Sequence, residues 1–176
     1  MSNITVFASS SHYCPKNFLD SAYELGQILG TNKHHVIYGG GCRGLMGKLT
    51  DGVLSVGGHI EGIIPEFMVS MGWENSTSSE LKIVSTMHER IDYMLQKADV
   101  IITLPGGIGT LEELMQALSW KYLGLIIPKI YILNQDGFFD RLLAHLDFIY
   151  EQKFMGAEPV QLYTTMNSLE ELTNQL

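Results

Sequence analysis

The sequence predicts a three-layer α/β fold in which a mainly parallel central sheet is covered by helices on both faces. Short apolar, β-branched runs alternate with amphipathic stretches of helical period along the whole chain. Several of these runs lack polar alternation, as expected for strands that are covered on both faces. We expect a single domain over residues 1–176, because no linker or composition shift divides the chain.

The short apolar runs predict the strands, and the stretches of helical period predict the helices. Strands are expected at 4–8, 35–38, 59–64, 81–85, 100–104, 130–133 and 160–165. Helices are expected at 17–29, 45–56, 87–98, 110–123, 138–154 and 169–176. Residues 68–79 are expected to form a mobile loop. Three strands end in Ser or Gly clusters, and ligands of parallel sheets bind beyond the carboxyl ends of the strands, so the site is expected at that edge.

Composition limits the classes of partner. The net charge is −8 with 11 Lys and Arg residues, whereas binding to nucleic acid or an anionic membrane needs clustered cations, so neither partner is expected. No apolar run reaches the roughly 20 residues of a membrane helix, and the first residues lack secretory-signal features, so a cytoplasmic location is expected. Cys14 and Cys42 form no disulfide framework. Neither a metal nor a cofactor is expected.

Residues 39–44, Gly-Gly-Gly-Cys-Arg-Gly, match the G-x-G-x-x-G pattern of dinucleotide-binding loops. The match is weak, because the loop follows the second strand and no acidic residue ends the next one. Two interpretations remain open. The glycines serve a tight turn from strand to helix, or they permit close approach of a nucleotide.

A second glycine loop, residues 105–110, joins a buried strand to a helix. Amide groups at a helix N-terminus bind phosphate, with help from the helix dipole. The loop lacks the Gly-Lys-Ser/Thr sequence that holds a triphosphate with magnesium. It therefore predicts a monophosphate site at Gly106, Gly107, Gly109 and Thr110.

Two charged side chains could perform chemistry. Thr110 and Glu113 have the spacing of a capping box with Thr110 as N-cap, which would give Glu113 a structural role. However, the face that carries Glu113, Ala117 and Trp120 is poor in the charges of a solvated surface, which predicts a ligand cleft or a subunit contact. Arg90 lies at the edge of an apolar stripe. It is either an arginine that extends to solvent or a cation positioned beside a glycine loop.

Six segments in a fixed order resemble the LOG family, the cytokinin riboside 5′-monophosphate phosphoribohydrolases once mislabelled lysine decarboxylases. They are VFASSS (6–11), YGGGCRGLMG (38–47), GIIP (62–65), MHER (87–90), PGGIGTLEE (105–113) and NQDGFFD (134–140). The resemblance spans about residues 3–155 and implies a Rossmann-like homodimer. It also implies hydrolysis of the N-glycosidic bond of a nucleoside 5′-monophosphate, a cytokinin riboside monophosphate or AMP, to a free base and ribose 5-phosphate.

The resemblance places the family's catalytic Arg and Glu at Arg90 and Glu113. The predicted substrate- and phosphate-binding residues are Ser9, Gly40, Gly41, Met87, Gly106, Gly107, Gly109, Thr110 and Ser119. Ser119 stands where the family frequently has Thr, and Ile91 stands where it commonly has Lys. The dimer interface is expected near the helix face of Glu113, Ala117 and Trp120.

Three functions are compared. In the hydrolase, Glu113 would stabilise the positive charge of an oxocarbenium-like transition state. The alternative is a non-catalytic carrier of a phosphorylated cofactor, such as the molybdenum cofactor, because relatives with this glycine architecture have that role. A pyridoxal-phosphate-dependent lysine decarboxylase has little support, since the sequence marks no lysine as a Schiff-base residue.

Overall fold

The central layer is one seven-stranded sheet in the computed structural model, which describes all of residues 1–176. Its strands are β1 (Asn3–Phe7), β2 (His35–Tyr38), β3 (His59–Pro65), β4 (Glu80–Val84), β5 (Val100–Thr103), β6 (Lys129–Leu133) and β7 (Thr164–Met166). They lie in the order β4-β3-β2-β1-β5-β6-β7, and every neighbouring pair is parallel. The predicted Rossmann-like architecture is confirmed.

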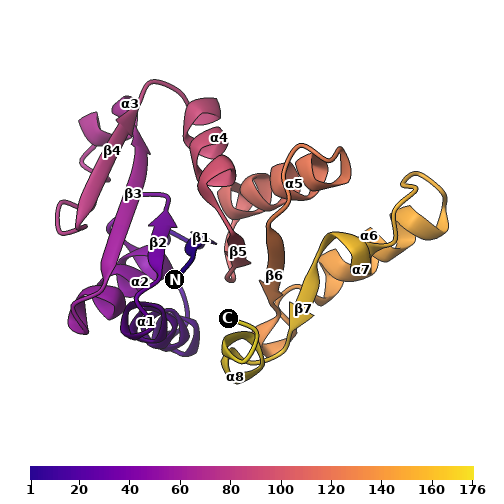
Figure 1. Ribbon diagram of the computed structural model, residues 1–176, viewed down its shortest axis with the longest axis horizontal. Helices are drawn as coiled ribbons and strands as arrows, with labels where there is room; N and C mark the ends of the chain where they lie inside the picture. Colours follow the sequence, from indigo (N-terminus) through magenta and orange to yellow (C-terminus); the bar gives the residue numbers. More distant parts are fainter.

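Helices cover both faces of this sheet, as Figure 1 shows. They are α1 (Lys16–Thr31), α2 (Gly44–Ser55), α3 (Glu66–Ser70), α4 (Met87–Lys97), α5 (Ile108–Tyr122), α6 (Asp140–Glu151), α7 (Pro159–Leu162) and α8 (Leu169–Thr173), with a 3₁₀ turn at Gln135–Gly137. Helices α1, α2 and α8 pack on one face, whereas α4, α5, α6 and α7 pack on the other. None of the helices combines the length and the hydrophobicity required to span a membrane.

Each face of the sheet has its own hydrophobic cluster, and β1 contributes to both. Ile4 and Val6 belong to the cluster under α1 and α2, whereas Phe7 belongs to the cluster under α4 and α5. All three side chains are fully buried, and burying each contributes about 1.5–3 kcal/mol to folding. Thr5 lies on the α4 side, where its hydroxyl donates to the carbonyl oxygen of Met94 at 2.8 Å. The central strand is therefore fixed from both faces.

Glycines set the close contact between α1 and α2. A Cβ on Gly26 would lie 2.9 Å from the Val53 nitrogen and would overlap the Leu49 carbonyl oxygen. A Cβ on Gly52 would similarly overlap the carbonyl oxygen of Tyr23. The two helices therefore approach each other at a distance that leaves no room for larger side chains.

The order of the strands reverses at β1, which has β2 on one side and β5 on the other. At such a switch point the connections leave the sheet in opposite directions and open a crevice beyond the carboxyl ends of the strands. The loops that follow β1, β2 and β5 meet there. The fold therefore brings together the Ser and Gly clusters that end these strands.

Two expected elements differ in the structure. Residues 160–165 are not one strand, because Pro159–Leu162 form α7 and only Thr164–Met166 form β7. Glu158 and Gln161 make a capping box around the turn, and Pro159 occupies its first position, a combination that favours a helix start. Helix α3 (Glu66–Ser70) includes part of the segment that was expected to be a loop.

Candidate active site

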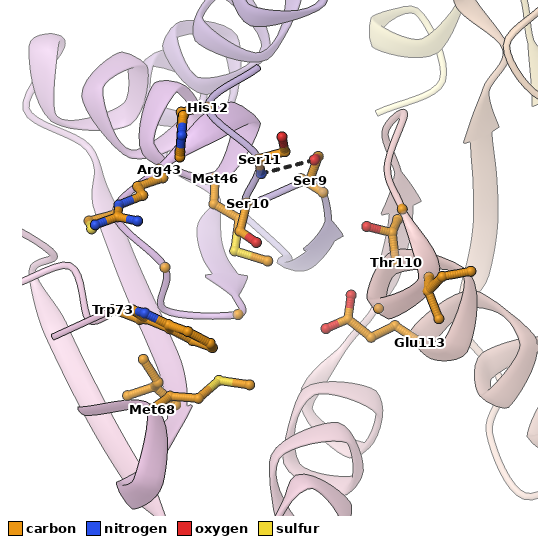
Figure 2. A pocket seen from close by; sticks show the side chains of 18 of the residues that line it. Ser9, Ser10, Ser11, His12, Arg43, Met46, Met68, Trp73, Thr110 and Glu113 are labelled. Atoms are coloured by element: carbon orange, nitrogen blue, oxygen red, sulfur yellow. Dashed lines mark hydrogen bonds between the residues drawn. The ribbon is translucent and has the colours of Figure 1, made fainter. Parts of the chain in front are cut away.

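A cavity of about 470 Å³ lies in the crevice at the carboxyl ends of β1, β2 and β5. Its walls are formed by the loops after these strands, by the first turns of α4 and α5, and by residues between Ile64 and Trp73. Figure 2 shows the side chains converging on this space. The volume is in the range of small-molecule sites.

Arg90 is held in place between the ends of β2 and β3. Its side chain is almost completely buried, at 5% exposed. Its Nε donates to the carbonyl oxygen of Ile63 at 3.0 Å, and its Nη2 donates to that of Gly39 at 3.4 Å. A Cβ on Gly39 would overlap this guanidinium, so the glycine leaves room for it. The interpretation of Arg90 as a surface arginine is therefore wrong.

Glu113 lies on the second turn of α5 and is paired with Arg90. Its Oε1 is 2.8 Å from the Arg90 Nη2, and the residue is 2% exposed. Burial raises the pKa of Glu113 above its ordinary value, although the charge and the hydrogen bond of Arg90 oppose this rise. The carboxyl group points into the cavity (Figure 2). The pocket therefore contains one buried acidic group with a fixed cationic partner.

The capping-box interpretation of Glu113 is wrong. Helix α5 begins at Ile108, its N-cap residue is Gly107, and no side chain caps it. Thr110 therefore lies within the first turn, and Glu113 is free of any capping bond. The first amide groups of an α-helix have no intrahelical acceptor, so those of the first turn of α5 can donate to a ligand. Gly107, Gly109 and Thr110 line the cavity, and the helix dipole favours an anion there.

Most of the predicted site residues come together around this cavity. Those that line it are Ser9, Gly41, Met87, Arg90, Gly107, Gly109, Thr110 and Glu113. Gly40, Gly106 and Ser119 are outside this lining.

The three other residues have identifiable positions. Gly40 has a φ of +74°, and its carbonyl oxygen accepts from the Asn75 nitrogen at 2.8 Å, so it shapes the turn after β2. A Cβ on Gly106 would lie 2.5 Å from the Cβ of Thr110, so it allows close packing at the start of α5. Ser119 is exposed and lies about 9 Å farther along α5 than Glu113. Ile91, which stands where the family commonly has Lys, is buried in the second hydrophobic cluster. This difference from the family therefore lies in the core.

Sequence reasoning missed several cavity residues, above all Met68 and Trp73. They lie in the segment that was expected to be mobile. The structure ties this segment to the glycine loop through the backbone. The Cys42 nitrogen donates to the Trp73 carbonyl oxygen at 3.2 Å, and Gly41 forms an antiparallel bridge with Glu74. Hydrogen bonds between backbone groups leave no pattern in the side chains. The one feature of the sequence that could have indicated a role for this segment was a Trp among polar residues.

The helix face expected near a dimer interface is largely covered by the chain itself. Ala117 is fully buried and Glu113 is 2% exposed, both inside a single chain. Trp120 is half-buried and packs against the second hydrophobic cluster. Ala117 and Glu113 therefore offer almost no surface to a subunit contact, Trp120 keeps part of its surface, and the homodimer near this face stays a prediction.

Sequence comparison identifies relatives that match nearly the whole chain. A family model described as "Possible lysine decarboxylase" matches residues 46–176. A probable cytokinin riboside 5′-monophosphate phosphoribohydrolase of Oryza sativa subsp. japonica, LOGL9, is 35% identical over 98% of this chain and 76% of its own length. The cytokinin riboside 5′-monophosphate phosphoribohydrolase LOG1 of Arabidopsis thaliana is 35% identical over 98% of this chain and 81% of its own.

Solved structures share the fold at lower identity. The molybdenum cofactor carrier protein of Chlamydomonas reinhardtii superposes with a TM-score of 0.76 and 18% identity, covering 99% of this chain and 94% of that one. The molybdenum cofactor binding protein of Rippkaea orientalis gives a TM-score of 0.71 and 20% identity, with coverages of 98% and 92%. These similarities establish the architecture, whereas the sequence matches establish the kinship. The chain belongs to the LOG family, to which the possible-lysine-decarboxylase model also corresponds.

Proposed function

We propose that the protein hydrolyses the N-glycosidic bond of a nucleoside 5′-monophosphate, a cytokinin riboside 5′-monophosphate or AMP, to a free base and ribose 5-phosphate. The observation that carries this proposal is the buried carboxyl group of Glu113, paired with Arg90 and facing a cavity beside the N-terminus of α5. The names of the relatives LOG1 and LOGL9 support the same reaction.

The phosphate would bind at the start of α5. Gly107, Gly109 and Thr110 line the cavity there, and the amides of the first turn can donate to phosphate oxygens. Glu113 follows Thr110 by about one helical turn, so a ribose attached to that phosphate lies beside the carboxyl group. Fixing the phosphate restricts the motion of the sugar, which lowers the entropic part of the barrier.

In the proposed mechanism a carboxylate lies near C1′ of the ribose. The bond between C1′ and the base nitrogen breaks, and its electron pair leaves with the base, which takes up a proton. Water forms the new bond to C1′ and releases a proton. Positive charge develops on the sugar between these events, and the Glu113 carboxylate would stabilise it and orient the water. Arg90 would position Glu113 and balance the charge around the departing base.

Replacing Glu113 with Gln tests this assignment. The amide keeps the size of the side chain but carries no charge, so we expect base release from AMP to fall at least 100-fold. Release of adenine is measured by chromatography, and circular dichroism verifies that the fold is intact. Turnover equal to that of the wild type would refute the role of Glu113.

The same assay separates a hydrolase from a carrier. The wild-type protein is incubated with AMP, isopentenyladenosine monophosphate, GMP and CMP, and base release is compared with binding measured by calorimetry. Release from at least one nucleotide supports the hydrolase. Binding without any release across this panel would favour the carrier.

A further inference from the structure

The cavity has two chemically different walls, and the proposed mechanism uses one of them. The polar wall carries the glycine loop of α5, Glu113 and Arg90. Much of the apolar lining comes from Met46, Ile64, Met68, Trp73 and Met87, and Ala8, Tyr13 and Ile108 add to it. In Figure 2, Trp73 and Met68 lie across the cavity from Thr110 and Glu113. Apolar lining of this kind suits a part of the ligand other than the phosphate and the sugar.

Two large aromatic side chains line the cavity, Tyr13 and Trp73. Tyr13 is 86% exposed, whereas Trp73 is partly covered and its backbone is held by hydrogen bonds to two neighbouring segments. Its carbonyl oxygen accepts from the Cys42 nitrogen at 3.2 Å, and its own nitrogen donates to the Met68 carbonyl oxygen at 3.1 Å. Asn75, two residues later, donates to the Gly40 carbonyl oxygen at 2.8 Å. These bonds anchor the segment to both α3 and the glycine loop, so the backbone position from which the indole extends is defined.

The indole also retains free surface. Trp73 is 45% exposed, although large aromatic side chains are usually well buried. Its ring extends into the cavity in Figure 2. A partly exposed aromatic face on a fixed backbone beside a ligand cavity is suited to stack on a planar ring.

We propose that Trp73 is the base-stacking residue of this pocket, and that it selects purine nucleoside monophosphates over those with smaller bases. This inference rests on the proposed function, which places the phosphate at the start of α5 and the ribose at Glu113. The base and the phosphate leave the ribose from different carbons, so the base extends away from α5 toward the opposite wall. A purine offers a larger π-face than a pyrimidine and stacks more strongly on the indole.

Kinetics of Trp73 variants give the first test. Stacking acts on the base in the ground state and the transition state alike, so Trp73→Ala should raise KM for AMP about tenfold or more and leave kcat within about threefold. Trp73→Phe retains an aromatic face and should restore most of the affinity. The matched control is Trp120→Phe, since Trp120 lies on α5 outside the cavity lining. A loss of kcat alone, or an equal loss in the Phe and Ala variants, would overturn the stacking role.

Fluorescence tests the contact without any turnover. The chain has two tryptophans, so Trp73 is the single tryptophan in a Glu113→Gln, Trp120→Phe protein, and it is excited at a wavelength that the eight tyrosines do not absorb. AMP should quench its emission, whereas ribose 5-phosphate, which has no base, should leave the emission unchanged while competing with AMP. CMP should bind more weakly than AMP.

The outcomes distinguish this inference from the proposed function. If AMP binds by calorimetry with no change in Trp73 emission, Trp73 is not the base-stacking residue. If AMP does not bind at all, the proposed nucleotide site itself fails, and the stacking role fails with it. If AMP quenches Trp73 but the Glu113→Gln protein still releases adenine at the wild-type rate, the role of Glu113 fails and the stacking assignment stands.

Discussion

Arg90 is a buried cation whose three hydrogen-bonding partners belong to three different parts of the fold. It donates to the carbonyl oxygens at the end of β2 and within β3, and it pairs with Glu113 of α5. A guanidinium presents several donors in a fixed plane, which is why one side chain satisfies all three acceptors. Removing it would leave a buried carboxyl group and two buried carbonyl oxygens without this partner.

We expect Arg90→Met to lower the free energy of unfolding by about 3–5 kcal/mol at pH 7, because breaking one side of a buried pair leaves the other charge uncompensated. The double variant Arg90→Met, Glu113→Gln should recover part of this loss. Urea unfolding followed by circular dichroism measures both. The Glu113→Gln single variant completes the cycle, and a double variant whose loss equals the sum of the two single losses would show that the two side chains are not coupled.

The same pair predicts a pH dependence. Burial already raises the pKa of Glu113 above its ordinary value of 4.5, and loss of Arg90 removes the groups that oppose this rise. A carboxyl group with a raised pKa favours the folded state where it is protonated, and this stabilisation is lost as the pH rises through the folded-state pKa. The stability deficit of Arg90→Met relative to the double variant should therefore shrink as the pH falls toward 4.5. A deficit that does not vary with pH would contradict this.

At the scale of the element, two glycines at the start of α5 differ in how their replacement by alanine should change the stability of the protein. A Cβ on Gly106 would lie 2.5 Å from the Thr110 Cβ, whereas a Cβ on Gly109 meets nothing within 4 Å. Gly106→Ala should therefore cost about 1–3 kcal/mol of stability through overpacking. Gly109→Ala should add about 0.5–1 kcal/mol, because alanine favours the helix. Thermal unfolding compares the two, and equal midpoints would contradict the packing at this loop.

The strands and long helices could be predicted because their hydrophobic periods are regular. The six strands expected between residues 4 and 133 and the helices α1, α2, α4 and α5 all occur near the predicted positions. The short helix α8 was also expected, at 169–176, whereas the short helices α3 and α7 were not. α3 has five residues and α7 has four, and segments of one turn are set by caps and neighbouring contacts rather than by a period.

The site was predictable in part for the same reason. Glycine loops and charged residues at strand ends have sequence signatures, and the fold brings eight of the predicted residues to one cavity. The burial of Arg90 could not be predicted in this way. Arg90 lies at the edge of the apolar stripe of its helix, and a residue at that position is compatible with either a buried or an exposed side chain. The position of Trp73 depends on backbone bonds between segments about 30 residues apart, which the pattern of side chains does not encode.

At the scale of the whole molecule, the segment after α5 presents an apolar surface to solvent. Leu123 is 62% exposed, Leu125 is 59% exposed and Ile127 is 94% exposed. Neighbouring apolar side chains with this exposure indicate a contact surface. The expected homodimer could bury these residues in place of the covered face around Ala117.

We therefore expect light scattering to give a particle of twice the chain mass. Ile127→Asp should convert it to a monomer, because an interface that buries this side chain would have to desolvate the new charge. Ile83→Asp on the edge strand β4 is the control, since Ile83 is also exposed but lies at the far edge of the sheet. A wild-type monomer, or an Ile127→Asp protein that remains dimeric, would contradict this interface.

The pairing of Arg90 with Glu113 has a consequence for how the protein can diverge. Arg90 is anchored to β2 and β3, and Glu113 is carried by the helix that follows β5, so the pair spans the two sides of the switch point. The distance between the β2–β3 side and the α5 side of the crevice, and the proposed reaction in that crevice, thus depend on the same two side chains. Trp73 and Met68 lie on a separate segment, so new substrate preferences can evolve there while the reacting centre is left untouched.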